Sequence, residues 1–287
     1  AASKPSNPDT GTPMTRLAIL ALLLSAATPA FADDPCAHSA PRNLQLDFAG
    51  VRNVVFDIGH NELRLDARPG GNGAVSGRAC ASNAGDLDRL KLTQQKSGDT
   101  LVVKAWREGN GLSGWFGNRY AELRLSATVP DNLPVALEVG SGDAWVNGTA
   151  SLDATVGSGD LDIKRIPGKV SAKVGSGDIE IENVGALHVP SIGSGDVSVR
   201  NVRGEVEVGS IGSGDFSLDR AGGRVGIGSI GSGDASLTGI AGAVEVGSIG
   251  SGDLDVRGAS ELTARSIGSG DIDHRNVRGK VELPRKR

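Results

Sequence analysis

The sequence predicts an all-β protein, built as a two-sheet parallel β-helix (a β-solenoid) with an N-terminal cap. The phrase Gly-Ser-Gly-Asp, always preceded by Val or Ile, occurs eight times between Val139 and Asp271, at intervals of 17 to 19 residues. A fixed period close to 20 residues is typical of stacked repeats. Apolar and polar residues alternate on both sides of each phrase, as in strands with one buried face. A second turn about nine residues further on predicts two opposed sheets with 18–19 residues per coil.

Equivalent positions of successive repeats form columns of similar residues. The position before the phrase and the first and third positions after its Asp are apolar, until His274 ends the last of these columns. Coils of a solenoid lie about 4.8 Å apart, so such columns stack, and each buried Ile or Leu contributes roughly 1.5–3 kcal/mol. An extra residue in later repeats, at Gly209, Gly228 and Gly247, predicts a bulge before the turn.

The repeated phrase itself suggests a tight turn. We expect its glycines to supply positive φ angles and its Asp to accept hydrogen bonds from N–H groups of the turn. The alternative is a cation column, because some solenoids bind Ca²⁺ through Gly- and Asp-rich turns. Here only one turn per coil carries the Asp, so we favour structural turn residues and expect no metal or other cofactor. They are Asp143, Asp160, Asp178, Asp196, Asp215, Asp234, Asp253 and Asp271.

The N-terminal segment has the features of an exported protein. Residues 1–13 lack hydrophobic periodicity and are expected to be a disordered extension. Residues 14–32 resemble a signal peptide, with Arg16, an apolar run of about 11 residues, and the cleavage pattern Ala30-Phe31-Ala32. The run is too short to span a bilayer. We therefore expect a periplasmic, surface or secreted location and no membrane span in the mature chain.

Cysteine content and charge agree with export. The two cysteines, Cys36 and Cys80, are expected to form one disulfide in an oxidising compartment. The formal net charge is −4, and no basic stripe with interleaved aromatic residues is present. This composition argues against a nucleic-acid partner.

Residues 33–134 carry weaker strand patterns than residues 135–287, which contain the eight repeats. We interpret the first part as an N-terminal β cap with irregular first coils, joined to the repeats near Pro130 to Pro134; a separate small sandwich is the alternative. Aromatic residues gather in and near a Gly-rich loop, and Trp145 is expected to point outward nearby. They are candidate ligand-binding residues, although the interpretation that we favour is that they pack as a cap over the end of the solenoid: Trp106, Trp115, Phe116, Tyr120 and Trp145.

No catalytic motif is evident. The four histidines are scattered, and the sequence contains no nucleophile elbow and no phosphate-binding P-loop. The best candidate for enzyme chemistry is Asp162 with Glu180 beside Trp145, because carboxylates on adjacent coils would lie about 5 Å apart, close to the separation in retaining glycosidases. Every acidic column has this spacing, so we predict a protein that is not an enzyme.

The eight copies of (Val/Ile)-Gly-Ser-Gly-Asp after a signal peptide resemble a bacterial family of exported proteins, described as putative adhesins or auto-transporter adhesin head domains. The resemblance implies a right-handed two-sheet β-helix with the phrase at the tight turn between the sheets. It implies no catalytic residues and a role in adhesion or in the cell envelope, with a glycan or another cell-surface component as partner. A carbohydrate-active enzyme on the same scaffold, such as a polysaccharide lyase or glycosidase, and a structural or regulatory component of the envelope-stress response are the alternatives.

Overall fold

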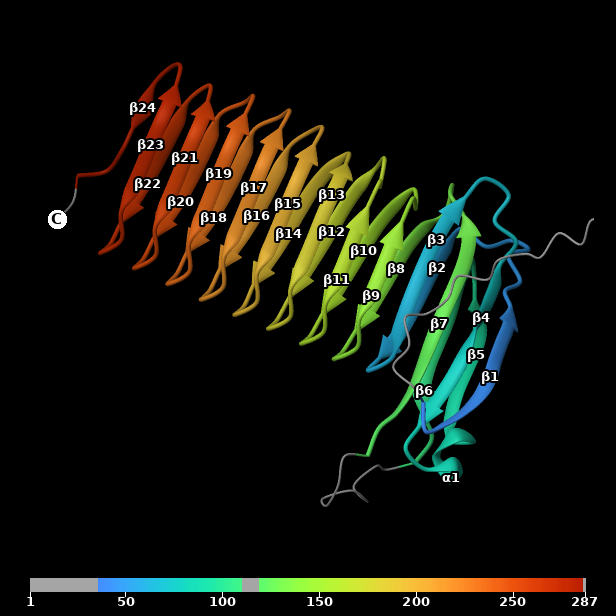
Figure 1. Cartoon of the computed structure of the whole chain (residues 1–287). Coiled ribbons are helices and arrows are strands. Elements are labelled where there is room, and N and C mark those ends of the chain that lie inside the picture. The colour runs from blue at the N-terminus through green and yellow to red at the C-terminus, as the bar shows by residue number, and fades with distance from the viewer. Residues whose placement is uncertain (1–35, 110–118, 286–287) are drawn as a thin grey trace, which may run out of the picture. The chain divides into compact units, whose positions relative to one another are not determined.

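The computed structural model describes residues 36–109 and 119–285. The expected extension (residues 1–13) and signal peptide (residues 14–32) lie outside the described residues. The described strands form two sheets of 12 strands each (Figure 1), and the helix α1 (Ala84–Leu87) lies between β4 and β5. The predicted fold class, an all-β solenoid with two sheets, is therefore confirmed.

Each sheet is a single row of strands. In spatial order sheet A contains β1 (His38–Gln45), β4 (Ala74–Ala81), β7 (Ala121–Pro130), β3 (Glu62–Arg68), β9 (Ala144–Asn147), β11 (Leu161–Lys164), β13 (Ile179–Val184), β15 (Val197–Val202), β17 (Phe216–Ala221), β19 (Ala235–Ile240), β21 (Leu254–Ala259) and β23 (Ile272–Val277). Sheet B contains β5 (Leu90–Ser97), β6 (Thr100–Arg107), β2 (Asn53–Gly59), β8 (Pro134–Val139), β10 (Ser151–Val156), β12 (Lys169–Val174), β14 (Ala186–Ile192), β16 (Val206–Ile211), β18 (Val225–Ile230), β20 (Val244–Ile249), β22 (Leu262–Ile267) and β24 (Val281–Glu282).

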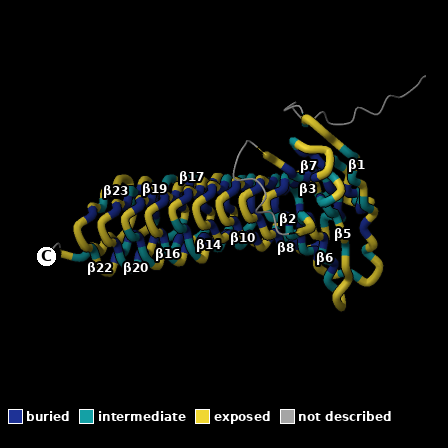
Figure 2. The backbone as a smooth tube through the Cα atoms, turned by 90° about the horizontal axis from the view of Figure 1, so that it is seen from below, coloured by how far each residue is buried: buried dark blue, intermediate teal, exposed yellow. Residues whose placement is uncertain are grey.

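From β8 onward the chain alternates between the sheets, and each strand pairs in parallel with the equivalent strand of the next coil. Val197 pairs with Phe216 and Val199 with Leu218, so apolar residues stack on apolar residues. These side chains are almost completely buried between the sheets, and buried positions recur from coil to coil as far as β21 and β22 (Figure 2). The core ends at the last coil, where His274 is exposed as predicted.

The predicted bulge is present in sheet B. The pairing of β12 with β14 gains one residue between His188 and Ile192, and later pairings skip the positions of Gly209, Gly228 and Gly247. The extra residue therefore begins at Pro190 and passes from coil to coil as a column of its own.

The N-terminal strands belong to the same two sheets but do not follow the chain order. The coil made by β2 and β3 lies between the coil of β6 and β7 and the coil of β8 and β9. Beyond them, antiparallel strands β1, β4 and β5 close the end of the solenoid. The expected Cys36–Cys80 disulfide joins the start of the described chain to β4, with the Cα atoms 5.2 Å apart.

Glycine is required in the repeated phrase for a different reason from the one expected. None of them has a left-handed φ angle. In each phrase the second glycine is buried against the preceding coil, and an added Cβ would lie only 1.7–2.0 Å from a backbone oxygen of that coil. The expectation of positive φ was wrong, because close contact between coils excludes any side chain at this position.

The aspartates of the phrase also bond differently from the expectation. The Oδ1 atom of each Asp except the last accepts a hydrogen bond from the backbone N–H of the Asp in the next coil, rather than from its own turn. Seven such bonds of 2.7–3.1 Å link the eight phrases from Asp143 to Asp271. The column thus joins successive coils along one edge of the solenoid, which we call the phrase edge.

The opposite edge carries the left-handed backbone. The fifth residue after every phrase Asp has a φ between 56° and 80°, and this column, which we call the left-handed column, consists of Gly148, Arg165, Asn183, Asn201, Arg220, Gly239, Gly258 and Asn276. Each of these residues lies where the chain leaves sheet A for sheet B.

Candidate functional site

A groove of about 550 Å³ lies on the outer face of sheet A, next to the phrase edge. Trp145 of β9, Asp162 of β11, Glu180 of β13 and Ser198 and Arg200 of β15 line it, together with the phrase aspartates of the neighbouring coils. We call this the Trp145 groove. It brings together Trp145, Asp162 and Glu180, which the sequence predicted to be neighbours.

Strand register places these side chains in one row. Trp145 pairs with Asp162, Asp162 with Glu180, and Glu180 with Ser198. Residues on either side of each, such as Ala144 and Val146, are buried in the core, so alternation turns the row outward. The row therefore presents one aromatic, two acidic and one hydroxyl side chain at intervals of about 4.8 Å.

Trp145 is held by a residue from the coil before it. The guanidinium carbon of Arg64, on β3, lies 4.3 Å from the centroid of the Trp145 ring, and the two residues are partners in the sheet register. A guanidinium stacked on an indole contributes about 0.5–1 kcal/mol at an exposed site. This contact orients the indole while the ring still lines the groove.

Two acidic side chains of the Trp145 groove, Asp162 and Glu180, form ion pairs. Lys164 Nζ lies 2.7 Å from Asp162 Oδ2, and Arg200 Nη1 lies 2.9 Å from Glu180 Oε1. The hydrogen bond to Asp162 raises the pKa of Lys164 above its ordinary value. The phrase aspartates in the lining, Asp160, Asp178 and Asp196, accept hydrogen bonds from backbone N–H groups of the next coil instead.

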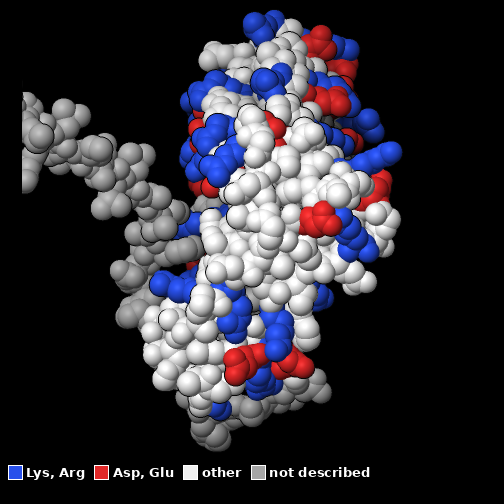
Figure 3. Space-filling view, turned by 90° about the vertical axis from the view of Figure 1, so that its right-hand side faces the viewer, with Lys and Arg blue, Asp and Glu red and all other residues white. Residues whose placement is uncertain are grey.

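Charges of both signs are interspersed elsewhere too. The face at the cap end shows Lys and Arg side chains next to Asp and Glu side chains, around a broad uncharged area (Figure 3).

Within residues 36–109 and 119–285, no group of three or more His, Cys, Asp or Glu side chains is arranged to hold a metal ion. None of the helices in that part of the chain is long and apolar enough to cross a membrane.

The other predicted aromatic residues do not join this groove. Trp106 alternates with buried residues of β6 and therefore faces outward from sheet B, on the opposite side of the solenoid. Tyr120 is 38 % exposed just before β7, and its hydroxyl accepts a hydrogen bond of 2.8 Å from the N–H of Ala37. Trp115 and Phe116 lie outside the described residues. A single aromatic surface is therefore not formed by Trp106, Tyr120 and Trp145.

Arg64 and Arg200 were not predicted as part of the site. Arg200 could have been found, because it follows Ser198 by two residues and so lies on the same outer face of the strand. Arg64 could not, because its coil is out of chain order and lies 81 residues before Trp145 in the sequence.

Comparison with known proteins identifies the family. The model of the family described as Toastrack DUF4097 matches residues 68–224, which is more than half of the chain. The chain belongs to the Toastrack family. No curated protein matches the sequence. The matched residues begin at the last residue of β3, so Arg64 lies just before their start, and they include the whole of the Trp145 groove in β9 to β15.

Solved structures of similar proteins share the Toastrack fold. A putative adhesin from Parabacteroides distasonis superposes with a TM-score of 0.56 at 13 % identity, covering 83 % of this chain and 97 % of that chain. A putative adhesin from Parabacteroides merdae superposes with a TM-score of 0.55 at 13 % identity, covering 83 % and 96 %. The resemblance to an adhesin family is thereby confirmed at the level of fold.

Proposed function

We propose that this Toastrack protein is an exported, non-enzymatic binding protein that holds a glycan of a cell surface or of the envelope in the Trp145 groove. The observation that carries the proposal is the half-buried indole of Trp145, which is fixed by Arg64 and lines a groove rich in polar side chains. A flat apolar ring suits the C–H face of a sugar, and neighbouring hydroxyl and charged groups can bind its hydroxyls.

Several further features support an exported binding role. The Cys36–Cys80 disulfide is typical of proteins in oxidising compartments, and the N-terminal segment has the pattern of a signal peptide. Both similar structures carry the description putative adhesin.

A glycan array probed with the disulfide-bonded protein tests the proposal. We expect the wild-type protein to bind a restricted set of glycans and Trp145→Ala to weaken that binding about tenfold, the effect of about 1.4 kcal/mol. Trp106→Ala is the matched control, because Trp106 is also half-buried and faces outward from the other sheet. It should leave binding unchanged, and both variants should keep the wild-type melting temperature within a few degrees.

Three outcomes would contradict the proposal. Absence of binding to any glycan would favour a purely structural or regulatory role in the envelope. Equal binding by wild type and Trp145→Ala would show that the glycan binds outside the Trp145 groove. A Trp115→Ala variant would then test whether it binds at the Gly-rich loop. Release of reducing or unsaturated sugar, abolished by Glu180→Gln, would instead establish a carbohydrate-active enzyme.

A further inference from the structure

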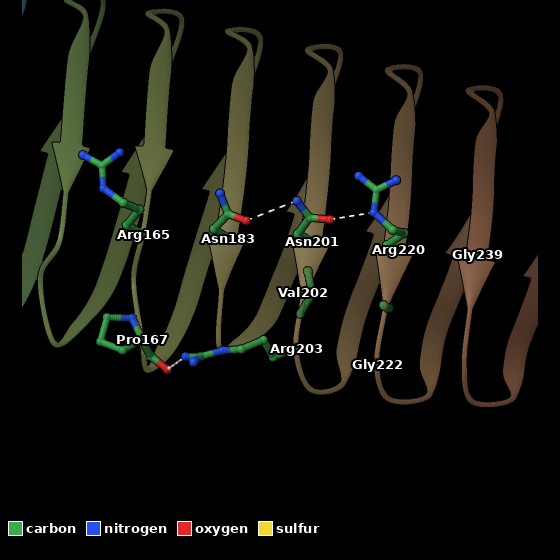
Figure 4. A pocket seen from close by; sticks show the side chains of 10 residues that line it. Arg165, Pro167, Asn183, Asn201, Val202, Arg203, Arg220, Gly222 and Gly239 are labelled. Carbon is green, nitrogen blue, oxygen red and sulfur yellow. Dashed lines mark hydrogen bonds between the residues drawn. The ribbon is translucent and has the colours of Figure 1, made fainter.

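A second groove, of about 530 Å³, runs along the left-handed edge of the solenoid (Figure 4). Its lining includes Arg165, Arg203 and Arg220 but no acidic residue. This arginine groove lies where the chain passes from sheet A to sheet B. The Trp145 groove adjoins the other edge, so the two sites are independent.

Two of the arginines occupy backbone positions that do not favour arginine. Arg165 and Arg220 belong to the left-handed column, with φ angles of 56° and 69°. The other six members of the column are Gly or Asn, which tolerate this conformation best. Arginine gains nothing from the backbone here, and strained residues of this kind cluster at ligand sites. Their side chains, rather than the turn, therefore account for their presence.

The arginines are largely uncompensated. Arg165 and Arg203 have no ion-pair partner among the residues that the structure describes, and Arg203 Nη2 donates only to the carbonyl oxygen of Pro167, at 2.6 Å. Arg220 is paired with its neighbour Asp219 at 2.9 Å. The groove thus carries net positive charge, although the whole chain is acidic with a formal net charge of −4.

Side-chain amides connect and orient this row. Arg220 Nε donates to Asn201 Oδ1 at 2.7 Å, and Asn201 Nδ2 donates to Asn183 Oδ1 at 3.1 Å. Figure 4 shows Arg165, the two asparagines and Arg220 as one row, with Arg203 reaching toward Pro167 in a second row. Three coils separate Arg165 from Arg220, or about 14 Å at the usual spacing between strands. The cations are therefore spread along a line and are not focused on one point.

The floor between the rows is apolar. Pro167, Val202, Ala221 and Gly222 line it, and no aromatic residue does. A small inorganic anion would leave this floor unused, and single-stranded nucleic acid relies on aromatic side chains to stack its bases. Sugar rings can rest on an apolar floor while acidic groups along the chain meet the arginines, which bind carboxylates through paired N–H donors.

We infer that the arginine groove binds a linear polysaccharide that carries carboxylates along its length, such as a polyuronate. Each carboxylate accepts hydrogen bonds from a guanidinium, and the row of cations sets the direction of the chain along the solenoid. The proposal goes beyond the Trp145 groove and does not depend on it, because no residue is shared between the two linings.

Calorimetric titration with polygalacturonate oligomers tests the inference. The wild-type protein should bind them, bind more weakly as salt is raised, and fail to bind the methyl-esterified polymer, which keeps the rings and lacks the charges. The double variant Arg165→Asn/Arg220→Asn should weaken binding at least tenfold. Asn already occupies this column at other coils, so the substitution keeps the left-handed backbone.

Matched controls separate this site from other effects of charge. Arg257→Asn removes an exposed arginine that is ion-paired on the outer face of sheet A and should leave the affinity unchanged. Trp145→Ala should also leave it unchanged, so the two proposals can fail separately. Absence of binding, equal binding of the esterified polymer, or equal affinity of the double variant would overturn the inference. The inference would also be overturned if a single-stranded DNA oligonucleotide bound the wild-type protein more tightly than polygalacturonate and the double variant abolished that binding.

Discussion

At one edge of the solenoid every coil turns through the same four residues, whereas at the other edge every coil turns through one left-handed residue whose identity varies. The phrase edge repeats Gly-Ser-Gly-Asp eight times. The left-handed column contains three Gly, three Asn and two Arg. Both edges keep the same period, so the difference lies in what each turn needs from its side chains.

The phrase edge is constrained by contact between coils. Its second glycines approach the backbone of the preceding coil so closely that a Cβ has no room, and its aspartates bond to the N–H groups of the next coil. Glycines at the left-handed edge also pack closely, with an added Cβ of Gly222 2.2 Å from the carbonyl oxygen of Arg203. In the left-handed column itself, however, the requirement falls on the backbone, and the Arg and Asn side chains point outward. Variation is therefore tolerated at this edge, and a charged groove can develop there.

The largest expected effect is on the phrase edge. In Gly214→Ala the new Cβ would lie 1.9 Å from the carbonyl oxygen of Gly195, and the backbones of two coils would have to separate. Overpacking by one methyl group typically costs 1–3 kcal/mol; because the contact here is with backbone, we expect a loss of at least about 3 kcal/mol of unfolding free energy. Urea unfolding followed by circular dichroism measures it.

Gly226→Ala is the matched control. Gly226 also lies in the repeats, without a left-handed φ, and the nearest atom to its added Cβ is Arg224 Nη1 at 3.8 Å. The substitution should be neutral or stabilise the protein by up to about 1 kcal/mol, because it lowers the entropy of the unfolded chain. Equal destabilisation by both substitutions would show that strand glycines matter generally, and contact at the phrase edge would not explain the repeat.

A smaller effect is expected from the aspartate column. Asp215→Ala removes the acceptor of the 2.8 Å bond from the N–H of Asp234, a hydrogen bond to a charged group worth about 1.5–3 kcal/mol. Because the site is exposed and water can replace the carboxylate, we expect a loss near the lower limit, about 1.5 kcal/mol. Asp215→Asn keeps an oxygen at this position and should lose less than half as much in thermal unfolding. Equal losses would mean that the charge, rather than the bond between coils, stabilises this edge.

The architecture of the repeats could be predicted because every coil has the same pattern of apolar and polar residues around the phrase. Alternation around Val197 and Phe216, the column that ends at His274 and the bulge at Gly209 all follow from the period, and the structure has each of them. The pairing of Asp162 with Glu180 on adjacent strands, beside Trp145, follows from the same register. Because similar coils stack on one another, residues that are one period apart in the sequence become neighbours in space.

Features that depend on the path of the chain outside the repeats could not be predicted. The coil of β2 and β3 inserts between two later coils, and this brings Arg64 to Trp145. The sequence also did not show why the phrase requires glycine. A tight turn and a close contact between coils both favour glycine, and the sequence alone does not distinguish the two causes. The left-handed column could not be predicted either, because Arg165 and Arg220 interrupt its pattern of Gly and Asn.

The smallest effect tests the left-handed edge directly. Asn201 has a φ of 60° and hydrogen bonds to Asn183 and Arg220. Asn201→Ala should lose about 1 kcal/mol, since an alanine in this conformation places its Cβ close to a carbonyl oxygen at a cost of roughly 1–2 kcal/mol. Asn201→Gly removes the same side-chain bonds but relieves the backbone, so it should be the more stable of the two in thermal unfolding. If the two variants unfold at the same temperature, the side-chain row rather than the backbone determines this edge, and the tolerance for arginine in the column would need another cause.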